Sequence, residues 1–201
     1  TLFGRNSELN SIKDAYRRAA SGDSELVTIS GPSGSGKSVL VTEFGKYVKV
    51  SGGIFLSGKF DKLKQGKPFS ALASAFDQYC GMLLGNDALA QMRGKLSDRV
   101  KLVLGKEACY LTKLMRNLAT ILGLEMDETS LDQECSNAQK RLQFLLCRFV
   151  EVISSVFDAP IALFLDDLQW ADAASISAAS QLILSSMISS DSTHFFFVGC
   201  H

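Results

Sequence analysis

The fold of this chain is set by a short stretch near its N-terminus, Leu26-Val27-Thr28-Ile29-Ser30-Gly31-Pro32-Ser33-Gly34-Ser35-Gly36-Lys37-Ser38. Its first five residues are mainly aliphatic and β-branched, which predicts a strand. The next eight match the pattern G-x-x-x-x-G-K-[ST]. After them, Leu40, Phe44 and Val48 recur at helical spacing. A strand, a glycine-rich loop and a helix in this order predict a phosphate-binding loop.

Each residue type in the loop suits a phosphate group. Glycines allow the backbone N–H groups to curl around phosphate oxygens, and the following helix adds the partial positive charge of its N-terminus. We expect Lys37 to act in catalysis by reaching the β and γ phosphates, and Ser38 to be a ligand of Mg²⁺. The residues expected to contact ATP or ADP are Gly31, Pro32, Ser33, Gly34, Ser35, Gly36, Lys37, Ser38 and Val39. The alternative is a glycine-rich turn without a ligand.

A second motif is the apolar run Leu163-Phe164-Leu165 followed by Asp166 and Asp167. Acids at the end of a buried parallel strand lie at the carboxyl edge of the sheet, where the phosphate loop also lies, and this is the Walker B pattern. We expect Asp166 to hold Mg²⁺, usually through water, and Asp167 to orient or deprotonate the attacking water. The alternative is that Asp167 or Asp172 only caps the following helix.

Strand and helix patterns alternate along the chain, which predicts an α/β fold with a parallel sheet between helices. Further strands are expected at Ile54–Leu56, Pro160–Leu165 and Phe195–Val198, and further helices from Pro68, Asn137 and Ser175. The predicted parts are a lead-in helix over 6–21 capped by Asn6 or Ser7, a phosphate-loop core over 26–84, a helical insert over 86–135, and the rest of the core, with the acidic motif, over 137–201.

Composition narrows the classes of function. Hydrophobic residues make up 46% and charged residues 21%, as in ordinary globular domains, and the net charge is zero. No global field therefore attracts nucleic acid or an anionic membrane, and neither is an expected partner. No apolar run approaches the roughly 20 residues that span a bilayer. The five cysteines are widely spaced and lack a CxxC pair, which predicts reduced thiols and an intracellular, cytoplasmic location. The absence of an initial Met suggests a fragment.

Three segments together resemble a known family: Phe3-Gly4-Arg5, the loop from Gly31 to Ser38, and the stretch from Phe164 to Asp172. The chain resembles, over essentially its whole length, the AAA+/STAND family of P-loop ATPases in its AAA-16 or origin-recognition-like branch. The resemblance implies a three-layer P-loop fold with sheet order 5-1-4-3-2, whose last strand would lie outside this chain. It also implies binding of ATP or ADP with Mg²⁺, with Phe3, Gly4 and Arg5 near the adenine, and an oligomer that supplies an arginine finger.

The segment from Gly58 to Leu72 is similar to ATPase modules that lie between kinase-like and sensor regions of large signalling proteins. The expected function is therefore a nucleotide-dependent switch that acts on flanking domains of its own chain. Hydrolysis is expected to be slow because Asp167 stands where the family's motors have Glu, and because the chain ends where a polar sensor residue would follow.

Two other functions remain open. The same ATPase core also occurs in replication initiators and loaders that carry a DNA-binding winged helix. A P-loop kinase for small molecules is the third class, although the segment from Leu168 to Asp172 argues against it. The basic stretch with Lys59, Lys62, Lys64 and Lys67 is interpreted as a solvated loop, with contact to phosphate as the alternative.

Overall fold

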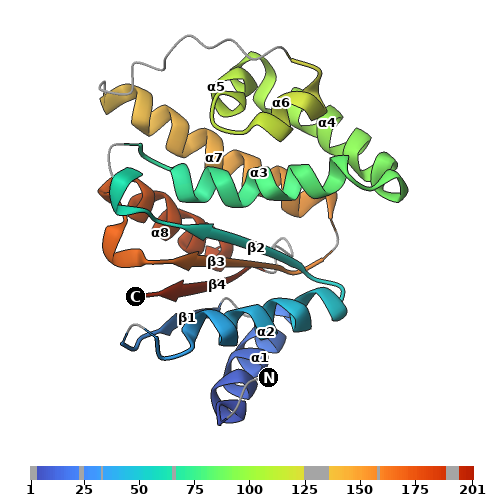
Figure 1. Ribbon diagram of the computed structural model, residues 1–201. Helices are drawn as coiled ribbons and strands as arrows, with labels where there is room; N and C mark the ends of the chain where they lie inside the picture. The colour runs from blue at the N-terminus through green and yellow to red at the C-terminus, as the bar shows by residue number, and fades with distance from the viewer. Residues whose placement is uncertain are drawn as a thin grey trace.

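The computed structural model describes residues 4–22, 25–32, 34–64, 67–124, 136–157, 159–188 and 195–201. Its sheet contains β1 (Glu25–Ile29), β2 (Ile54–Lys59), β3 (Ile161–Asp166) and β4 (Phe195–Cys200). The strands are parallel in the order β1-β4-β3-β2 (Figure 1), so the predicted parallel sheet is confirmed. This order is the 1-4-3-2 part of the expected arrangement; the described residues contain no fifth strand.

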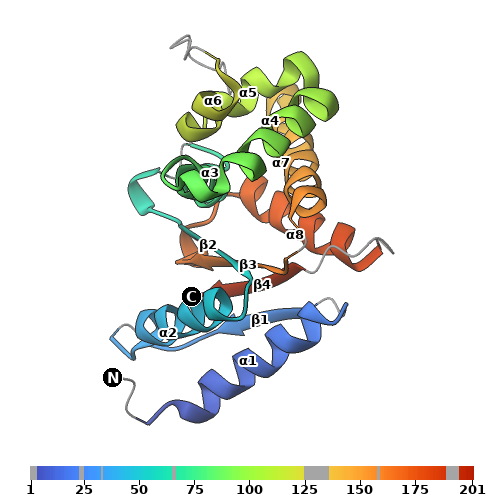
Figure 2. The same cartoon turned by 90° about the vertical axis from the view of Figure 1, so that its right-hand side faces the viewer.

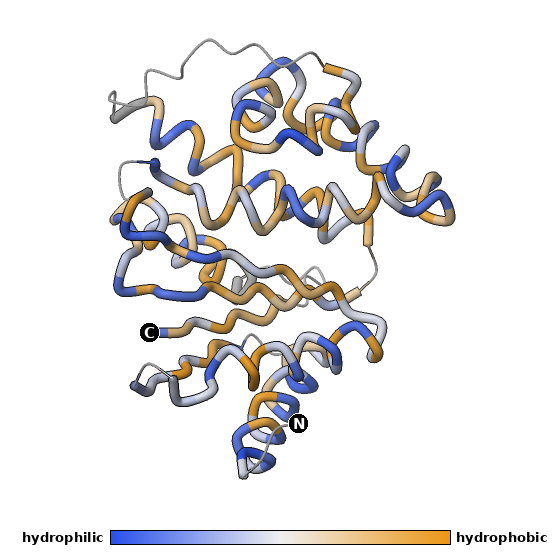
Figure 3. Tube along the Cα trace, in the orientation of Figure 1, coloured by the Kyte–Doolittle hydropathy of each residue, from blue (hydrophilic) through white to orange (hydrophobic). Residues whose placement is uncertain are grey.

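The two central strands, β3 and β4, are uninterrupted apolar runs because both of their faces are covered. Every residue of β4 is buried, and in β3 only Asp166 is partly exposed. The hydrophobic colour along these strands in Figure 3 follows this burial. Asp166 is therefore the point where β3 leaves the core, at the carboxyl edge of the sheet.

Helices cover both faces of the sheet (Figure 2). On one face α1 (Asn6–Ala20) and α2 (Lys37–Val50) pack on the sheet through a cluster that includes Tyr16, Phe44 and Phe196. On the other face lie α3 (Ser70–Leu84), α7 (Ser136–Val156) and α8 (Ala173–Ile188). The layers are those of a P-loop NTPase-like α/β fold, as predicted.

The start of α1 differs from the sequence prediction. The N-cap is Arg5, and no side-chain hydrogen bond caps the helix. Neither Asn6 nor Ser7 is therefore the cap; both lie within the helix, where their hydroxyl and amide groups cannot reach the first-turn N–H groups in the usual way. The ordering of α1 instead comes from its buried face, which includes Ile12, Tyr16 and Ala19.

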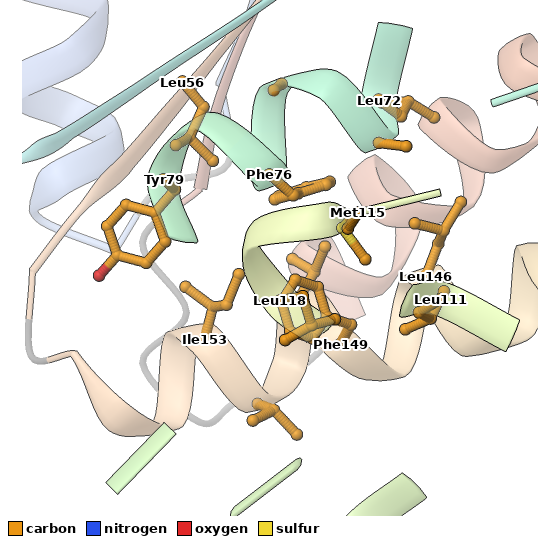
Figure 4. Close-up of a cluster of buried hydrophobic side chains, with 14 of the residues drawn as sticks. Leu56, Leu72, Phe76, Tyr79, Leu111, Met115, Leu118, Leu146, Phe149 and Ile153 are labelled. Atoms are coloured by element: carbon orange, nitrogen blue, oxygen red, sulfur yellow. The ribbon is translucent and has the colours of Figure 1, made fainter. Parts of the chain in front are cut away.

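A further helical layer lies beyond α3 and α7 (Figure 1). It contains η2 (Asp87–Leu89), α4 (Ala90–Leu104), η3 (Gly105–Glu107), α5 (Ala108–Thr112) and α6 (Arg116–Leu122). Within the described part of the helical insert expected over 86–135, the helices are interrupted at Gly105 and again at Met115, whose backbone is extended. Figure 4 shows Phe76 of α3, Phe149 of α7 and Leu118 of α6 meeting in one buried cluster. The acidic segment after Gly123 lies outside the described residues.

The approach of α3 to β2 requires a glycine. A Cβ atom at Gly58 would lie 2.3 Å from the backbone oxygen of Ala71, far closer than any real contact. α3 therefore rests directly on the end of β2. This packing fixes the neighbouring Lys59 at the carboxyl edge of the sheet, opposite Asp166 in the strand register.

Candidate functional site

The phosphate loop runs from the end of β1 to the start of α2. Gly34 and Gly36 adopt φ values of +79° and +84°, in the left-handed region that strains any other residue. At both positions the space that a side chain would occupy is empty within 4 Å. The loop therefore turns sharply into α2, and the N–H groups of the first turn of this helix have no partner within the helix. Ser33 lies outside the described residues.

Two polar side chains of the loop suit an anion. The buried Oγ of Ser35 has no hydrogen-bond partner among the described residues. The Nζ atom of Lys37 donates to the carbonyl oxygens of Gly31 and Pro32, at 2.5 and 3.2 Å. A buried hydroxyl without a partner is costly, and carbonyl oxygens do not neutralise a lysine as a carboxylate would. Both features, beside a helix N-terminus, fit a phosphate group.

The acidic turn follows β3 directly. Asp167 has a φ of 55°, unusual for a residue other than glycine, and its N–H donates to Oδ1 of Asp166 at 3.0 Å. Gln169 donates from Nε2 to Oδ1 of Asp167 at 3.1 Å. The local turn therefore directs two adjacent carboxylates outward from the carboxyl edge of the sheet.

Helix capping was the alternative role for these acids, and Asp172 has this role at the start of α8. Its carboxylate accepts hydrogen bonds from the backbone N–H and from the Oγ of Ser175, at 2.8 and 2.6 Å, in the first turn of α8. Asp167 makes no side-chain capping hydrogen bond to the short helix η4 (Leu168–Trp170). Asp172 thus has a structural role, whereas Asp166 and Asp167 keep carboxylate oxygens for another partner.

That partner is Lys59. Its Nζ lies 3.0 Å from Oδ2 of Asp167 and 3.7 Å from Oδ2 of Asp166. The hydrogen bond from Lys59 lowers the pKa of Asp167, and the same hydrogen bond, with the charges of both aspartates, raises the pKa of Lys59. The expected solvated loop is thus corrected for Lys59 in one respect: its side chain is exposed, as expected, but it is the last residue of β2 and its ammonium group pairs with the acidic turn.

β4 lies between the phosphate loop and the acidic turn and brings their charges into range of each other. Cys200, at its end, is opposite Ile29 of β1, and its thiol lies near enough to Asp166 for this carboxylate to affect its pKa. Burial, and then the nearby carboxylate of Asp166, raise the pKa of Cys200 to about 11. The charge of Lys37 makes a smaller contribution that opposes this rise at Cys200, and it adds to the lowering of the pKa of Asp167 that Lys59 causes. The structure therefore gathers Lys37, Asp166 and Asp167 at one edge of the sheet.

Other expected site residues are less closely placed. Ser38 and Val39 lie exposed on the first turn of α2. Gly4 and Arg5 directly precede α1, and among the described residues Arg5 makes no hydrogen bond or ion pair with the phosphate loop. Phe3 lies outside the described residues. The adenine side of the site thus stays a prediction.

The donor groups at this edge fit Mg²⁺ bound together with phosphate. Among the described residues no three His, Cys, Asp or Glu side chains form a metal cluster, as a metal site built only from protein would need. Mg²⁺ usually takes one or two carboxylates together with water and substrate phosphates. Asp166 and Asp167 offer such carboxylates, and the hydroxyl of Ser38 adds an oxygen at the start of α2.

The family model described as "AAA ATPase domain" matches residues 1–197. The chain belongs to this family of ATPase domains. It is also 32% identical over 176 residues to "Hybrid signal transduction histidine kinase G" of Dictyostelium discoideum, a match that covers 87% of this chain and 5% of that protein. The AAA ATPase module is thus a nucleotide-binding P-loop domain, and a similar segment occurs in a much longer signalling kinase. No helix among the described residues has the length and apolarity to span a bilayer.

Sequence reasoning missed two residues of the site, Lys59 and Cys200. Both come from strands far from the acidic motif in sequence and meet it only through parallel pairing. A signal for Lys59 did exist: if β2 and β3 pair from Ile54 and Ile161, Lys59 falls opposite Asp166. Cys200 carries no comparable signal, because a cysteine ending an apolar strand has the pattern of an ordinary buried thiol.

Proposed function

We propose that this AAA ATPase domain binds ATP or ADP with Mg²⁺, hydrolyses ATP slowly, and acts as a nucleotide-dependent switch in a signalling protein. The observation that supports nucleotide binding most strongly is the state of two polar side chains in the phosphate loop. Within the described part of the chain, the Oγ of Ser35 lacks a partner, and Lys37 donates to the carbonyls of Gly31 and Pro32. A phosphate group satisfies the first and attracts the second, and the first-turn N–H groups of α2 are further donors beside it.

The residues take distinct roles in this proposal. Lys37 leaves its loop carbonyls to bind the β and γ phosphates, and the hydroxyl of Ser38 and the carboxylate of Asp166 would hold Mg²⁺. When bound, Mg²⁺ would neutralise charge on the phosphate groups. Asp167 orients the attacking water and accepts its proton.

Slow hydrolysis is proposed because Asp167 stands where the motors of the family have Glu, and the Asp side chain is one methylene shorter. A general base works best with a pKa near the working pH, and before Mg-nucleotide binds the hydrogen bond from Lys59 lowers the pKa of Asp167. The ion pair also occupies one oxygen of this carboxylate, so Asp167 acts as a base only after the pair opens.

The signalling role rests on the similarity to a hybrid signal transduction histidine kinase, of which this chain spans 5%. We propose that flanking domains read the nucleotide state, that the domain is cytoplasmic, and that Phe3, Gly4 and Arg5 lie near the adenine. An arginine finger from a second copy would complete the site. The proposed parts are the lead-in helix 6–21, the core 26–84, the helical insert 86–135 and the remaining core 137–201.

The test measures nucleotide binding, the rate of phosphate release, and hydrogen exchange in the ATP-bound and ADP-bound states. We expect the domain to bind Mg-ATP and Mg-ADP, to release phosphate at less than about 1 per second, and to show different hydrogen exchange around β2 and the acidic turn in the two states. Turnover of about 10 per second, the median for enzymes, would contradict the switch. Identical exchange with ATP and ADP would also contradict it, because a switch requires two states.

A further inference from the structure

Lys59 occupies a defined place between two carboxylates. It is the last residue of β2, paired with Asp166 in the register, and its Nζ reaches Asp167 at 3.0 Å and Asp166 at 3.7 Å. The side chain of Lys59 is 66% exposed, whereas those of Asp166 and Asp167 are 20% and 32% exposed. The carboxylates are held by the turn, and the lysine reaches them from outside.

Adjacent carboxylates repel each other, and removing them partly from water increases the energetic cost of that repulsion. A cation between them offsets this cost, and Lys59 is such a cation. A divalent cation at Asp166 uses the same oxygens and repels the ammonium group at this range. Lys59 and the metal ion therefore compete for one acidic pair.

We infer that Lys59 is an internal counter-ion, a positioning residue that the divalent cation must displace from Asp166 and Asp167 when Mg-nucleotide binds. The inference rests on the proposed function. It assigns to Lys59 control over how much Mg²⁺ strengthens nucleotide binding. Lys59 does not act as a phosphate ligand, because its ammonium group is paired with carboxylates two strands away from β1, which leads into the phosphate loop.

The experiment measures a ratio of two dissociation constants for a fluorescent ATP analogue, one with excess EDTA and one with saturating Mg²⁺, at one fixed ionic strength. This ratio is the coupling between metal and nucleotide and does not depend on hydrolysis. The variants are Lys59→Met, Lys59→Arg and the control Lys67→Met, an exposed lysine of the same basic stretch. Since Lys59 is mostly exposed, its replacement leaves the fold intact, which circular dichroism and urea unfolding would verify.

In Lys59→Met the ratio is expected to rise about two- to fivefold, the range for an exposed ion pair, with an unchanged constant in EDTA. Lys59→Arg and Lys67→Met are expected to keep the wild-type ratio within about a factor of two, because one retains the charge and the other does not touch the acidic pair.

Three results would overturn the inference. An unchanged or smaller ratio in Lys59→Met would show that no competition exists. Weaker binding of this variant in EDTA would make Lys59 a phosphate ligand. An equal rise in Lys67→Met would reduce the effect to the overall charge of the basic stretch. A wild-type domain that binds no nucleotide would overturn the proposed function as well, whereas binding with an unchanged ratio would overturn this inference alone.

Discussion

The phosphate loop and the acidic turn lie at the same edge of the sheet, yet they differ in how their polar groups are satisfied. In the loop, the Oγ of Ser35 has no partner among the described residues, and Lys37 reaches only backbone carbonyls. In the turn, Asp166 and Asp167 already have Lys59 and a backbone N–H as partners. The anion-binding half is thus open to its ligand, whereas the metal-binding half carries its own cation. Nucleotide binding is therefore expected to begin at the loop.

The largest expected effect is in the open half. Replacing Lys37 by Met removes charge-assisted hydrogen bonds to phosphate, worth about 1.5–3 kcal/mol, so affinity for ATP is expected to fall about 10- to 100-fold with or without Mg²⁺. Isothermal titration calorimetry measures both constants. Lys46→Met, on the exposed side of α2, is the matched control and is expected to bind as the wild type does. Equal binding of ATP by Lys37→Met and the wild type would show that the phosphate loop does not bind the nucleotide.

The next effect is on the free energy of unfolding, and it concerns Ser175 in the first turn of α8. The buried Oγ of Ser175 accepts from the backbone N–H of Phe69, a residue with φ of 64°, and donates to Asp172. It ties the segment after β2 to the segment after β3. Ser175→Ala leaves the buried N–H of Phe69 unsatisfied and is expected to lower the free energy of unfolding by about 1–3 kcal/mol. Urea denaturation measures this, with the exposed Ser180→Ala as control. A loss below about 0.5 kcal/mol would show that the tie is unimportant.

A selective effect on the metal is expected from Asp166→Asn. This change keeps the size of the side chain but removes the negative charge that a divalent cation requires. Affinity for ATP in EDTA is expected to stay unchanged, and the strengthening by Mg²⁺ is expected to shrink about fivefold or more. Asp61→Asn, in the loop after β2, keeps the oxygen that accepts from Leu63 and serves as the control. If Asp166→Asn weakened ATP binding in EDTA as much as in Mg²⁺, the phosphate loop and the acidic turn would not act separately.

The smallest effect concerns Lys62, whose Nζ lies 5.1 Å from the centre of the Trp170 ring. This contact links η1 (Lys62–Lys64), the short helix after β2, to η4, which follows the acidic turn. An exposed cation–π contact is worth about 0.5–1 kcal/mol, so Lys62→Met is expected to lower the free energy of unfolding by about 0.5 kcal/mol. Urea unfolding of this variant and of Lys67→Met compares them directly. A change as large as that of Ser175→Ala would mean that Lys62 has a further buried role.

The features that could be predicted are those formed by consecutive residues of the sequence. The loop from Gly31 to Ser38 and the run ending at Asp166 were recognisable because each is a continuous pattern between a strand and a helix or loop. The four strands, their parallel pairing and the family followed from those patterns.

Contacts between distant segments were not predictable in the same way. Lys59, Cys200 and Ser175 meet the acidic turn or its flanks from other elements, and their roles depend on strand register or on the packing of α3. The division of the helical layer also escaped the pattern, since apolar spacing continues across Gly105 and Met115 although the helices do not. Local periodicity reports which face is buried, but not where a helix stops.

We propose that the loop binds phosphate by itself and that the acidic turn takes part only with a divalent cation. This proposal is tested most directly by titrating ATP into the wild-type domain in EDTA and again in saturating Mg²⁺. We expect measurable binding in EDTA and tighter binding in Mg²⁺. Binding that is absent under both conditions, or equally strong in both, would contradict the account.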